Sequence, residues 1–339
     1  MARRDEQDAA RLRGGPPVKG LDLDRLRDYL GSPRELTGQM FAGGRSNLTY
    51  AVTDGEKRWV LRRPPLGHVL PTAHDMVREH RVLSALSRAG FPAPAPILLC
   101  TDSSVIGAPF YLMEHVDGAV YRDISSFTPV AVRSLAFSLV DTLADLHAID
   151  PEAIGLGDFG RPEGFNERQV RRWKKQLDAS RSREVPGIEE LHARLAVDIP
   201  AGGAGAVVHG DYRLDNVLIG PSLQINAVLD WEMSTLGDPL SDVALMLVYA
   251  GLPMQTAAPL SVPGHPTLAE IGERYAERSG WDVGDLHWYV GFAAFKLAVI
   301  LEGVHYRYVQ GQTVGAGFET IGDLVGSLVS RGHEALEES

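Results

Sequence analysis

The sequence predicts an α+β protein of two lobes, in which a small five-stranded antiparallel sheet with one helix precedes a larger and mainly helical lobe. Short segments separated by turn signals fill the first 117 residues, and long segments of near-helical apolar spacing dominate from residue 118 onward. Three short apolar runs interrupt the helical lobe between residues 206 and 229. A chain of 339 residues is long enough to build a separate core in each lobe.

The N-terminal lobe, residues 21–117, is expected to hold three strands between residues 38 and 62. Asp54-Gly55 favours a hairpin there, because glycine supplies the positive φ that such turns require. Near-helical spacing predicts the one helix over residues 72–87. Two further strands, expected at residues 97–101 and 110–115, complete the sheet, and we place the hinge between the lobes near residues 114–118.

The C-terminal lobe, residues 118–339, is expected to begin with a helix capped by Thr128, because the proline that follows suits a first helical turn. Near-helical spacing predicts further helices near residues 166–180, 239–250, 268–279, 285–309 and 318–330. Short apolar runs predict strands at residues 206–209, 217–219 and 225–229. Residues 1–20 are rich in Arg, Asp, Gly and Pro, and we expect a disordered lead-in there.

Bulk composition narrows the class of protein. The formal net charge of −11 argues against a nucleic-acid surface, where positive charge supplies most non-specific affinity. The most apolar late stretch, residues 290–304, contains Lys296 and Glu302 and is short for a bilayer span, so we expect no membrane segment. The single cysteine, Cys100, cannot form an internal disulfide, and the cytoplasm is therefore the expected location. A monomer and a homodimer both stay open.

The strongest motif lies among the short strands of the helical lobe. His209-Gly210-Asp211 is followed by Asn216, and Asp230 ends the last of these strands. Phosphoryl transfer needs a group that accepts or orients the hydroxyl proton, and cations that neutralise the phosphates. Mg²⁺ takes hard oxygen ligands and usually only one or two protein carboxylates. The pattern therefore predicts Asp211 as the base, and Asn216 and Asp230 as ligands of Mg²⁺.

These motifs resemble those of known kinases. The spacing of Asp211 and Asn216 is similar to the catalytic loop of protein kinases, while His209-Gly210-Asp211 with Asp230-Trp231-Glu232 looks like the aminoglycoside phosphotransferase (APH) and choline kinase-like family. Residues 237–244 resemble the segment that follows the metal aspartate in that family, and residues 60–65 and 78–83 resemble its kinase domains fused to acyl-CoA dehydrogenases. The resemblance runs from residue 37 onward and implies a two-lobed protein-kinase-like fold.

The resemblance also implies a basic strand residue that reaches the phosphates and pairs with a helix carboxylate. Protein kinases use lysine at this position, whereas this chain has Arg62, or Arg63 if the register shifts by one residue. Alternation favours Arg62, because Val60 and Arg62 share one face of the strand while Leu61 and Arg63 share the other. Glu79 in the predicted helix is the expected partner. The alternative is an exposed strand arginine and a solvated helix glutamate.

Other nucleotide contacts are expected in the same lobe. In residues 43–47, backbone N–H groups and the side chain of Ser46 or Asn47 are candidates to cover the phosphates, although a plain hairpin turn is an equal alternative. The resemblance implies that backbone groups of Glu114 and Val116 bond an adenine edge at the hinge. ATP is therefore the expected nucleotide, and GTP stays open because side chains contribute little to that recognition.

The resemblance implies a small-molecule hydroxyl acceptor, bound in the helical lobe facing Asp211. Candidate contacts are Tyr212, Arg213, Trp231, Glu232 and the late helix, including Lys296, Glu302, His305, Tyr306 and Arg307. A cationic aminoglycoside would need clustered carboxylates, whereas the basic residues of the late helix suit an anionic or mixed acceptor at least as well. Hydroxyacyl compounds, sugars and amino alcohols stay open. For any single residue, an amphipathic helix with solvated charges is the simpler interpretation.

A second hypothesis is a nucleotide-binding pseudokinase or regulatory module without transfer activity. Its one sequence hint is Arg62 in place of lysine, and the presence of Asp211, Asn216 and Asp230 together argues against it. The remaining polar residues of the motif are expected to hold loops, pair locally or cap the next helix rather than react: His209, Asp215, Asp238 and Asp242.

Overall fold

The computed structural model describes residues 18–41, 47–67, 74–203, 205–253, 258–313 and 317–338. These residues form two compact units. The first contains the described residues up to Ala119 together with Asn226–Glu232, and the second contains those of Val120–Ile225 and from Met233 onward. The strip Asn226–Glu232, which carries Asp230, therefore belongs to the first unit, although its place in the sequence predicts the C-terminal lobe.

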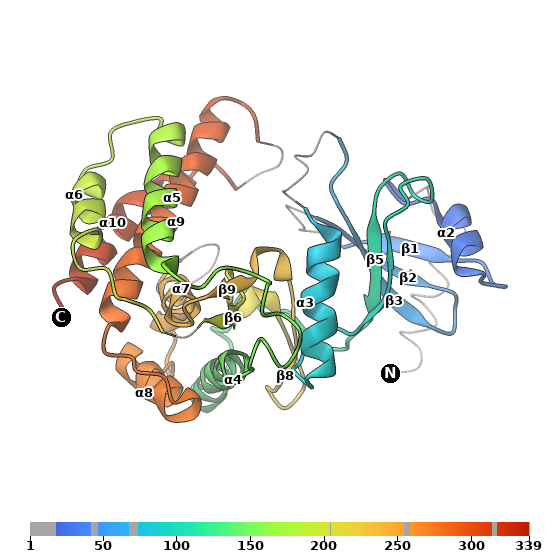
Figure 1. Ribbon diagram of the computed structural model, residues 1–339, viewed down its shortest axis with the longest axis horizontal. Helices are drawn as coiled ribbons and strands as arrows, with labels where there is room; N and C mark the ends of the chain where they lie inside the picture. Colours follow the sequence, from blue (N-terminus) through green and yellow to red (C-terminus); the bar gives the residue numbers. More distant parts are fainter. Residues whose placement is uncertain are drawn as a thin grey trace. The chain divides into compact units, whose positions relative to one another are not determined.

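The first unit is built on the predicted five-stranded antiparallel sheet (Figure 1). Its strands lie in the order β1-β2-β3-β5-β4. The β2–β3 hairpin turns at Asp54 and Gly55, where the Asp54 carboxylate accepts hydrogen bonds from two backbone N–H groups and Gly55 has a φ of 87°. The strands are β1 (Thr37–Met40), β2 (Leu48–Thr53), β3 (Arg58–Arg63), β4 (Pro96–Cys100) and β5 (Phe110–Glu114).

Two helices accompany this sheet. The predicted helix is α3 (Met76–Arg88), which begins later than expected because Asp75 caps its first turn. A second helix, α2 (Leu23–Leu30), precedes β1 and is not predicted by the sequence analysis. It is capped by Asp22 at its start and ends at Gly31 in the left-handed conformation. Its buried Leu26 joins a core that includes residues of β2, β3 and β5.

Consecutive arginines of β3 point to opposite faces of the sheet. Arg63 is buried and donates to the carbonyl oxygens of Gly20 and Ile106. Arg62 instead forms an ion pair with Glu79 of α3. Arg62, and not Arg63, is thus the residue that pairs with the helix carboxylate, as strand alternation predicts.

The second unit is mainly helical, as predicted. Its long helix α9 (Leu286–Val309) packs against α5, α6, α7 and α10. α4 (Pro129–His147) begins at the predicted cap Thr128. The short α6 is not predicted, and the short helix η4 (Ile321–Asp323) delays the last helix to residue 324. The other helices are α5 (Phe165–Ser180), α6 (Ile188–Leu195), α7 (Leu240–Ala250), α8 (Leu268–Ser279) and α10 (Leu324–Ala335).

Short strands position the motif loops. β6 (Ala206–Val208) pairs antiparallel with β9 (Thr235–Gly237), a strand that the sequence analysis does not predict. β7 (Val217–Ile219) and β8 (Ile225–Val228) form a second two-stranded sheet. The chain leaves β6 into the loop of Asp211, and it leaves β8 into the turn of Asp230.

One helix in the described part of the chain, α9, is long and apolar enough to cross a membrane by length and composition. However, 78% of its most apolar window is buried inside the protein.

Candidate active site

The loop that carries Asp211 leaves β6 through a glycine. Gly210 has a φ of 86°, and a Cβ atom there would lie 2.7 Å from the carbonyl oxygen of Met233. Both the conformation and this close approach require glycine. His209 is fully buried, and its Nδ1 accepts a hydrogen bond from the backbone N–H of Asp211 at 3.2 Å. The imidazole therefore holds the loop, the structural role expected of it.

Asp242, in the first turn of α7, anchors the same loop through its backbone. Its buried carboxylate accepts hydrogen bonds from the N–H groups of His209 at 2.5 Å and Gly210 at 2.8 Å. Nε2 of His147 lies 3.4 Å from this carboxylate, and Nδ1 lies 2.8 Å from the Tyr275 hydroxyl. Burial opposes ionisation, but His147 and the N–H groups together hold the pKa of Asp242 below its usual value.

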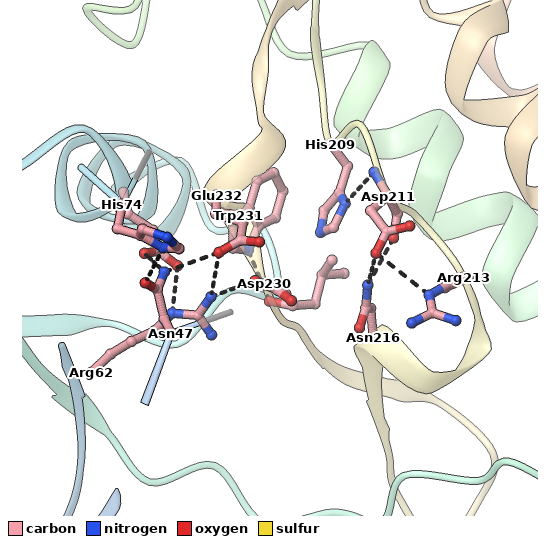
Figure 2. A network of polar contacts seen from close by, with 12 residues as sticks. Asn47, Arg62, His74, His209, Asp211, Arg213, Asn216, Asp230, Trp231 and Glu232 are labelled. Atoms are coloured by element: carbon pink, nitrogen blue, oxygen red, sulfur yellow. Dashed lines mark hydrogen bonds and ion pairs between the residues drawn. The ribbon is translucent and has the colours of Figure 1, made fainter. Parts of the chain in front are cut away.

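Asp211 and Asn216 are in direct contact (Figure 2). Nδ2 of Asn216 donates to the Asp211 carboxylate at 2.9 Å and to the Asp211 carbonyl oxygen at 2.8 Å. The short helix η1 (Leu214–Asn216) returns the chain to make this contact. Because the amide nitrogen makes both bonds, the amide oxygen of Asn216 is left for another partner and suits a hard cation.

Arg213 lies on the same loop as the predicted base. Its Nε is 3.4 Å from the Asp211 carboxylate, and its Nη1 is 3.2 Å from Asp215, the pairing expected for these two residues. The guanidinium carbon lies 4.9 Å from the centre of the Tyr249 ring, in cation–π contact. The carboxylates outweigh burial and raise the pKa of Arg213, so the guanidinium stays charged.

Lys296 of α9 brings a second positive charge to this loop. Its Nζ donates to the carbonyl oxygen of Gly210 at 3.4 Å and lies 5.7 Å from the centre of the Trp173 ring. Burial lowers the pKa of the ammonium, while Asp242 and Asp211 oppose that shift. The loop of the predicted base thus lies among two positive groups, Arg213 and Lys296, and two further carboxylates, Asp215 and Asp242.

Asp230 follows β8 in a backbone conformation that non-glycine residues seldom adopt. Its φ is 67°, in the left-handed region. Trp231 is buried beside it, donates from Nε1 to the carbonyl oxygen of Val228 at 2.9 Å, and packs edge-on against Phe91. Strained backbone of this kind is concentrated at ligand sites and switch regions.

Arg62 lies among three carboxylates of the first unit, of which Asp230 and Glu232 are labelled in Figure 2. Its Nε is 2.7 Å from Glu79, and one terminal nitrogen contacts Asp230 and lies 3.5 Å from Glu232. The Arg62 side chain is only 11% exposed. Within the described part of the chain, the N–H of Nε makes no hydrogen bond that meets geometric criteria, although Glu79 lies within ion-pair distance. The cluster therefore combines one cation with three acidic groups.

The pKa values of this cluster reflect its excess of acidic groups. Burial raises the pKa of Glu79 to about 7; Arg62 opposes this shift, while Asp230 and Glu232 add to it. Burial also disfavours the charged form of Arg62, but the acidic groups, Glu79 first, raise its pKa overall. The guanidinium therefore stays charged while one of its acidic neighbours is easily protonated.

Asn47 is built into the same cluster. Its Nδ2 donates to Glu232 at 3.0 Å and to Glu79 at 3.4 Å, and its Oδ1 lies 2.8 Å from Nδ1 of His74. Burial and the charge of Arg62 lower the pKa of His74. Both ends of the Asn47 amide are thus used inside the protein. Contact of this side chain with the phosphates stays a prediction.

The predicted site residues fall into two groups. Arg62, Glu79 and Asp230 lie together in the first unit, and Asp211 and Asn216 lie together in the second. That all five act at one point stays a prediction.

The remaining nucleotide contacts also stay predictions. Ser46 lies outside the described residues. The backbone N–H of Glu114 donates to Ala95 at 2.9 Å and is therefore committed to the protein, and Val116 follows β5 in a partly buried position.

Several residues expected to contact the acceptor have other partners. Tyr212 is fully buried and donates to the carbonyl oxygen of Leu139, and Glu232 belongs to the Arg62 cluster. Glu302 is fully buried and accepts hydrogen bonds from the loop after α5. Of the expected acceptor contacts, Arg213 lies 3.4 Å from the Asp211 carboxylate, and Lys296 donates to the carbonyl oxygen of the preceding Gly210.

The donor chemistry fits a magnesium ion. The described residues contain no group of three or more His, Cys, Asp and Glu side chains placed to hold a metal. The residues predicted for Mg²⁺ are instead one carboxylate, Asp230, and one amide oxygen, Asn216, a small set that leaves positions for phosphate and water. Three acidic groups around one guanidinium also leave an excess negative charge that a divalent cation would neutralise.

Comparison with known proteins defines the class. Residues 37–287 match the model of the family described as "Phosphotransferase enzyme family", abbreviated APH, and the chain belongs to this family. The two-lobed kinase-like fold predicted from the motifs is thereby confirmed.

The similar curated proteins are longer chains. The protein is 38% identical over 317 residues to acyl-CoA dehydrogenase family member 11 of Rattus norvegicus, an alignment that covers 87% of this chain and 41% of that relative. It is 33% identical over 315 residues to the probable acyl-CoA dehydrogenase IBR3 of Arabidopsis thaliana, an alignment that covers 85% of this chain and 38% of that relative. The chain thus spans less than half of these relatives. The predicted resemblance to kinase-like domains fused to acyl-CoA dehydrogenases is confirmed.

Solved structures agree with this assignment. A crystal structure from Ralstonia eutropha, assigned to the aminoglycoside phosphotransferases, has a TM-score of 0.82 and 31% identity, covering 94% of this chain and 99% of that one. A ternary complex of aminoglycoside phosphotransferase APH(4)-Ia with AMP-PNP and hygromycin B has a TM-score of 0.62 at 15% identity, covering 92% of this chain and 97% of that one. The second likeness concerns the fold alone.

Proposed function

We propose that the protein is an ATP- and Mg²⁺-dependent kinase that transfers the γ-phosphoryl group to a hydroxyl of a small molecule. The observation that carries this proposal is the contact between Asn216 and the Asp211 carboxylate, on a loop fixed by Asp242. Membership of the phosphotransferase family supports the reaction class. A structural neighbour that holds AMP-PNP supports an adenine nucleotide, with GTP left open.

In this proposal Asp211 orients the acceptor hydroxyl and receives its proton. The Asn216 amide holds the carboxylate in one orientation, and the buried network of Asp242 and His147 keeps the loop from moving. Positioning of this kind supplies a large share of the rate enhancement in phosphoryl transfer, which asks for little covalent chemistry. Arg213, beside the same carboxylate, would stabilise negative charge that develops on the transferred group.

Asn216 and Asp230 would hold the magnesium ion, which when bound would neutralise charge on the β- and γ-phosphates. In the first unit, an N–H of the Arg62 guanidinium would donate to a phosphate oxygen. Glu79 would keep the guanidinium in place for that contact.

The charges beside Asp211 favour an acceptor that carries negative charge near its hydroxyl. Lys296 is largely withdrawn from solvent, and its one described hydrogen bond, to Gly210, is long at 3.4 Å. An ammonium has three donors, so an anionic group of the acceptor would satisfy it better than the polycationic surface of an aminoglycoside would. The family's name should therefore not be taken as this protein's substrate.

The decisive experiment compares transfer with binding. Asp211→Asn should lower kcat by a factor on the order of 10³ or more while AMP-PNP binding with Mg²⁺ changes little, because the base acts only during transfer. ADP release should be measured with aminoglycosides, sugars, amino alcohols and hydroxyacyl compounds as acceptors. Full turnover by the variant would remove Asp211 from the role of base. Nucleotide binding without transfer to any acceptor would favour the pseudokinase instead.

A further inference from the structure

The Arg62 cluster places a guanidinium where a metal ion would be attracted. One terminal nitrogen of Arg62 contacts Asp230, the carboxylate proposed to hold the metal. The same nitrogen lies 3.5 Å from Glu232, so two carboxylates lie within reach of one end of the side chain. Nε lies 2.7 Å from Glu79 and provides a fixed point about which that end can turn.

Asn47 keeps the second carboxylate in place. Its Nδ2 donates to Glu232 at 3.0 Å and to Glu79 at 3.4 Å. Glu232 is therefore held by a neutral donor while it stays close to the guanidinium, at a distance longer than a tight ion pair. A small rotation of Arg62 would shorten that contact and leave Asp230.

The charge of Arg62 does not balance the charges around it. Its Nε–H makes no hydrogen bond of good geometry among the described residues, although Glu79 lies 2.7 Å away. Three acidic groups share one positive charge, and this imbalance draws a further cation to the cluster.

We propose that Arg62 is a built-in counter-ion for Asp230 in the metal-free protein, and that it turns to Glu232 when a metal ion binds Asp230. The inference rests on the proposed function, which makes Asp230 a metal ligand. Arginine suits this task because its planar fork contacts Glu79 and a second carboxylate together. A lysine ammonium is a compact point charge on a shorter side chain, and it lacks the planar fork that contacts two carboxylates together. Glu232 is then a positioning residue, since it receives the guanidinium without touching the nucleotide.

The test measures the Mg²⁺ concentration that gives half-maximal AMP-PNP binding, by calorimetry at fixed nucleotide concentration. Arg62→Lys should lower this concentration about tenfold, because losing a partly buried competing ion pair of about 1.4 kcal/mol corresponds to a factor of ten. Glu232→Gln should raise it by a factor of about three, since Arg62 loses its second partner and stays on Asp230. A purely structural role predicts no such opposite shifts.

A matched control lies next in the chain. Arg63→Lys makes the same chemical change on the opposite face of β3, so it should leave the Mg²⁺ requirement unchanged even if it lowers the melting temperature. An unchanged or increased requirement in Arg62→Lys would overturn the inference, as would an unchanged or decreased requirement in Glu232→Gln.

Asp230→Asn separates this inference from the function on which it rests. If Asp230 holds the metal, this variant should lose most of the Mg²⁺ dependence of AMP-PNP binding. Wild-type Mg²⁺ dependence in Asp230→Asn would remove the metal-ligand role itself. Loss of dependence in Asp230→Asn, combined with no shift in Arg62→Lys, would reject the counter-ion role alone.

Discussion

Replacing Asp242 by asparagine should release the catalytic loop while leaving α7 in place. The carboxylate accepts from two backbone N–H groups, those of His209 and Gly210. An asparagine carbonyl can accept from one of them, and its NH₂ group then faces the other donor. Hydrogen bonds to a charged group are worth about 1.5–3 kcal/mol each, and a buried unpaired donor costs about 1–3 kcal/mol. We therefore expect the variant to lose about 3 kcal/mol of loop stability.

Native-state hydrogen exchange measures this loss directly, because the two amides in question are the exchanging groups. A loss of about 3 kcal/mol corresponds to roughly a hundredfold fall in protection of the His209 and Gly210 amides. Displacement of Asp211 by even 1 Å should lower kcat by a factor of about 100, with little change in nucleotide affinity.

Asp238→Asn is the matched control. Asp238 is also buried near the start of α7, but it accepts from Leu240 and from the Tyr289 hydroxyl rather than from the catalytic loop. Its replacement should destabilise the second unit without selective exposure of the His209 and Gly210 amides. Wild-type protection of these two amides in Asp242→Asn would refute the anchoring argument.

Two further predictions concern charge. Lys296→Met should raise KM for an anionic acceptor about tenfold, the value of one charge-assisted hydrogen bond, and should leave AMP-PNP affinity unchanged. The control Lys174→Met removes a surface ion pair with Asp178 and should change neither quantity. An unaltered KM in Lys296→Met would reject a role of Lys296 in acceptor recognition. The pKa of Glu79, raised from 4.5 to about 7 in the folded protein, means that the folded state binds more protons than the unfolded state between these values. The free energy of unfolding of the first unit should therefore fall as pH rises from 4.5 to 7, by about 3 kcal/mol at most. Urea unfolding at several pH values should show a weaker pH dependence in Glu79→Gln. The same pH dependence in both proteins would contradict the raised pKa.

Local signals explain where the sequence predicted structure well. The bounds of α8 were predicted to the residue, because Thr267 and Glu270 form a capping box at its start and Gly280 adopts a left-handed conformation after its end. α4 likewise begins at its predicted cap. α6 was missed because it is only eight residues long and begins after Gly187, which provides no side-chain capping signal.

Long-range contacts explain what the sequence analysis missed at the candidate site. The internal contacts of Asn47 were not predicted, because one of its partners, Glu232, is 185 positions away in the chain. An acidic residue two positions after the metal aspartate was a usable signal for Glu232, but nothing local connects it to Arg62. The role of His74 in orienting the Asn47 amide had no sequence signal at all.

The strip Asn226–Glu232 means that the first unit is not encoded by one continuous stretch of the gene. The chain passes between units after Ala119, again after Ile225, and once more after Glu232. A gene fragment ending at Ala119 would encode the sheet and Arg62 but neither of the carboxylates that its terminal nitrogen contacts. A first unit that keeps the whole Arg62 cluster therefore requires residues 226–232 to be joined to residues 18–119 by a designed linker.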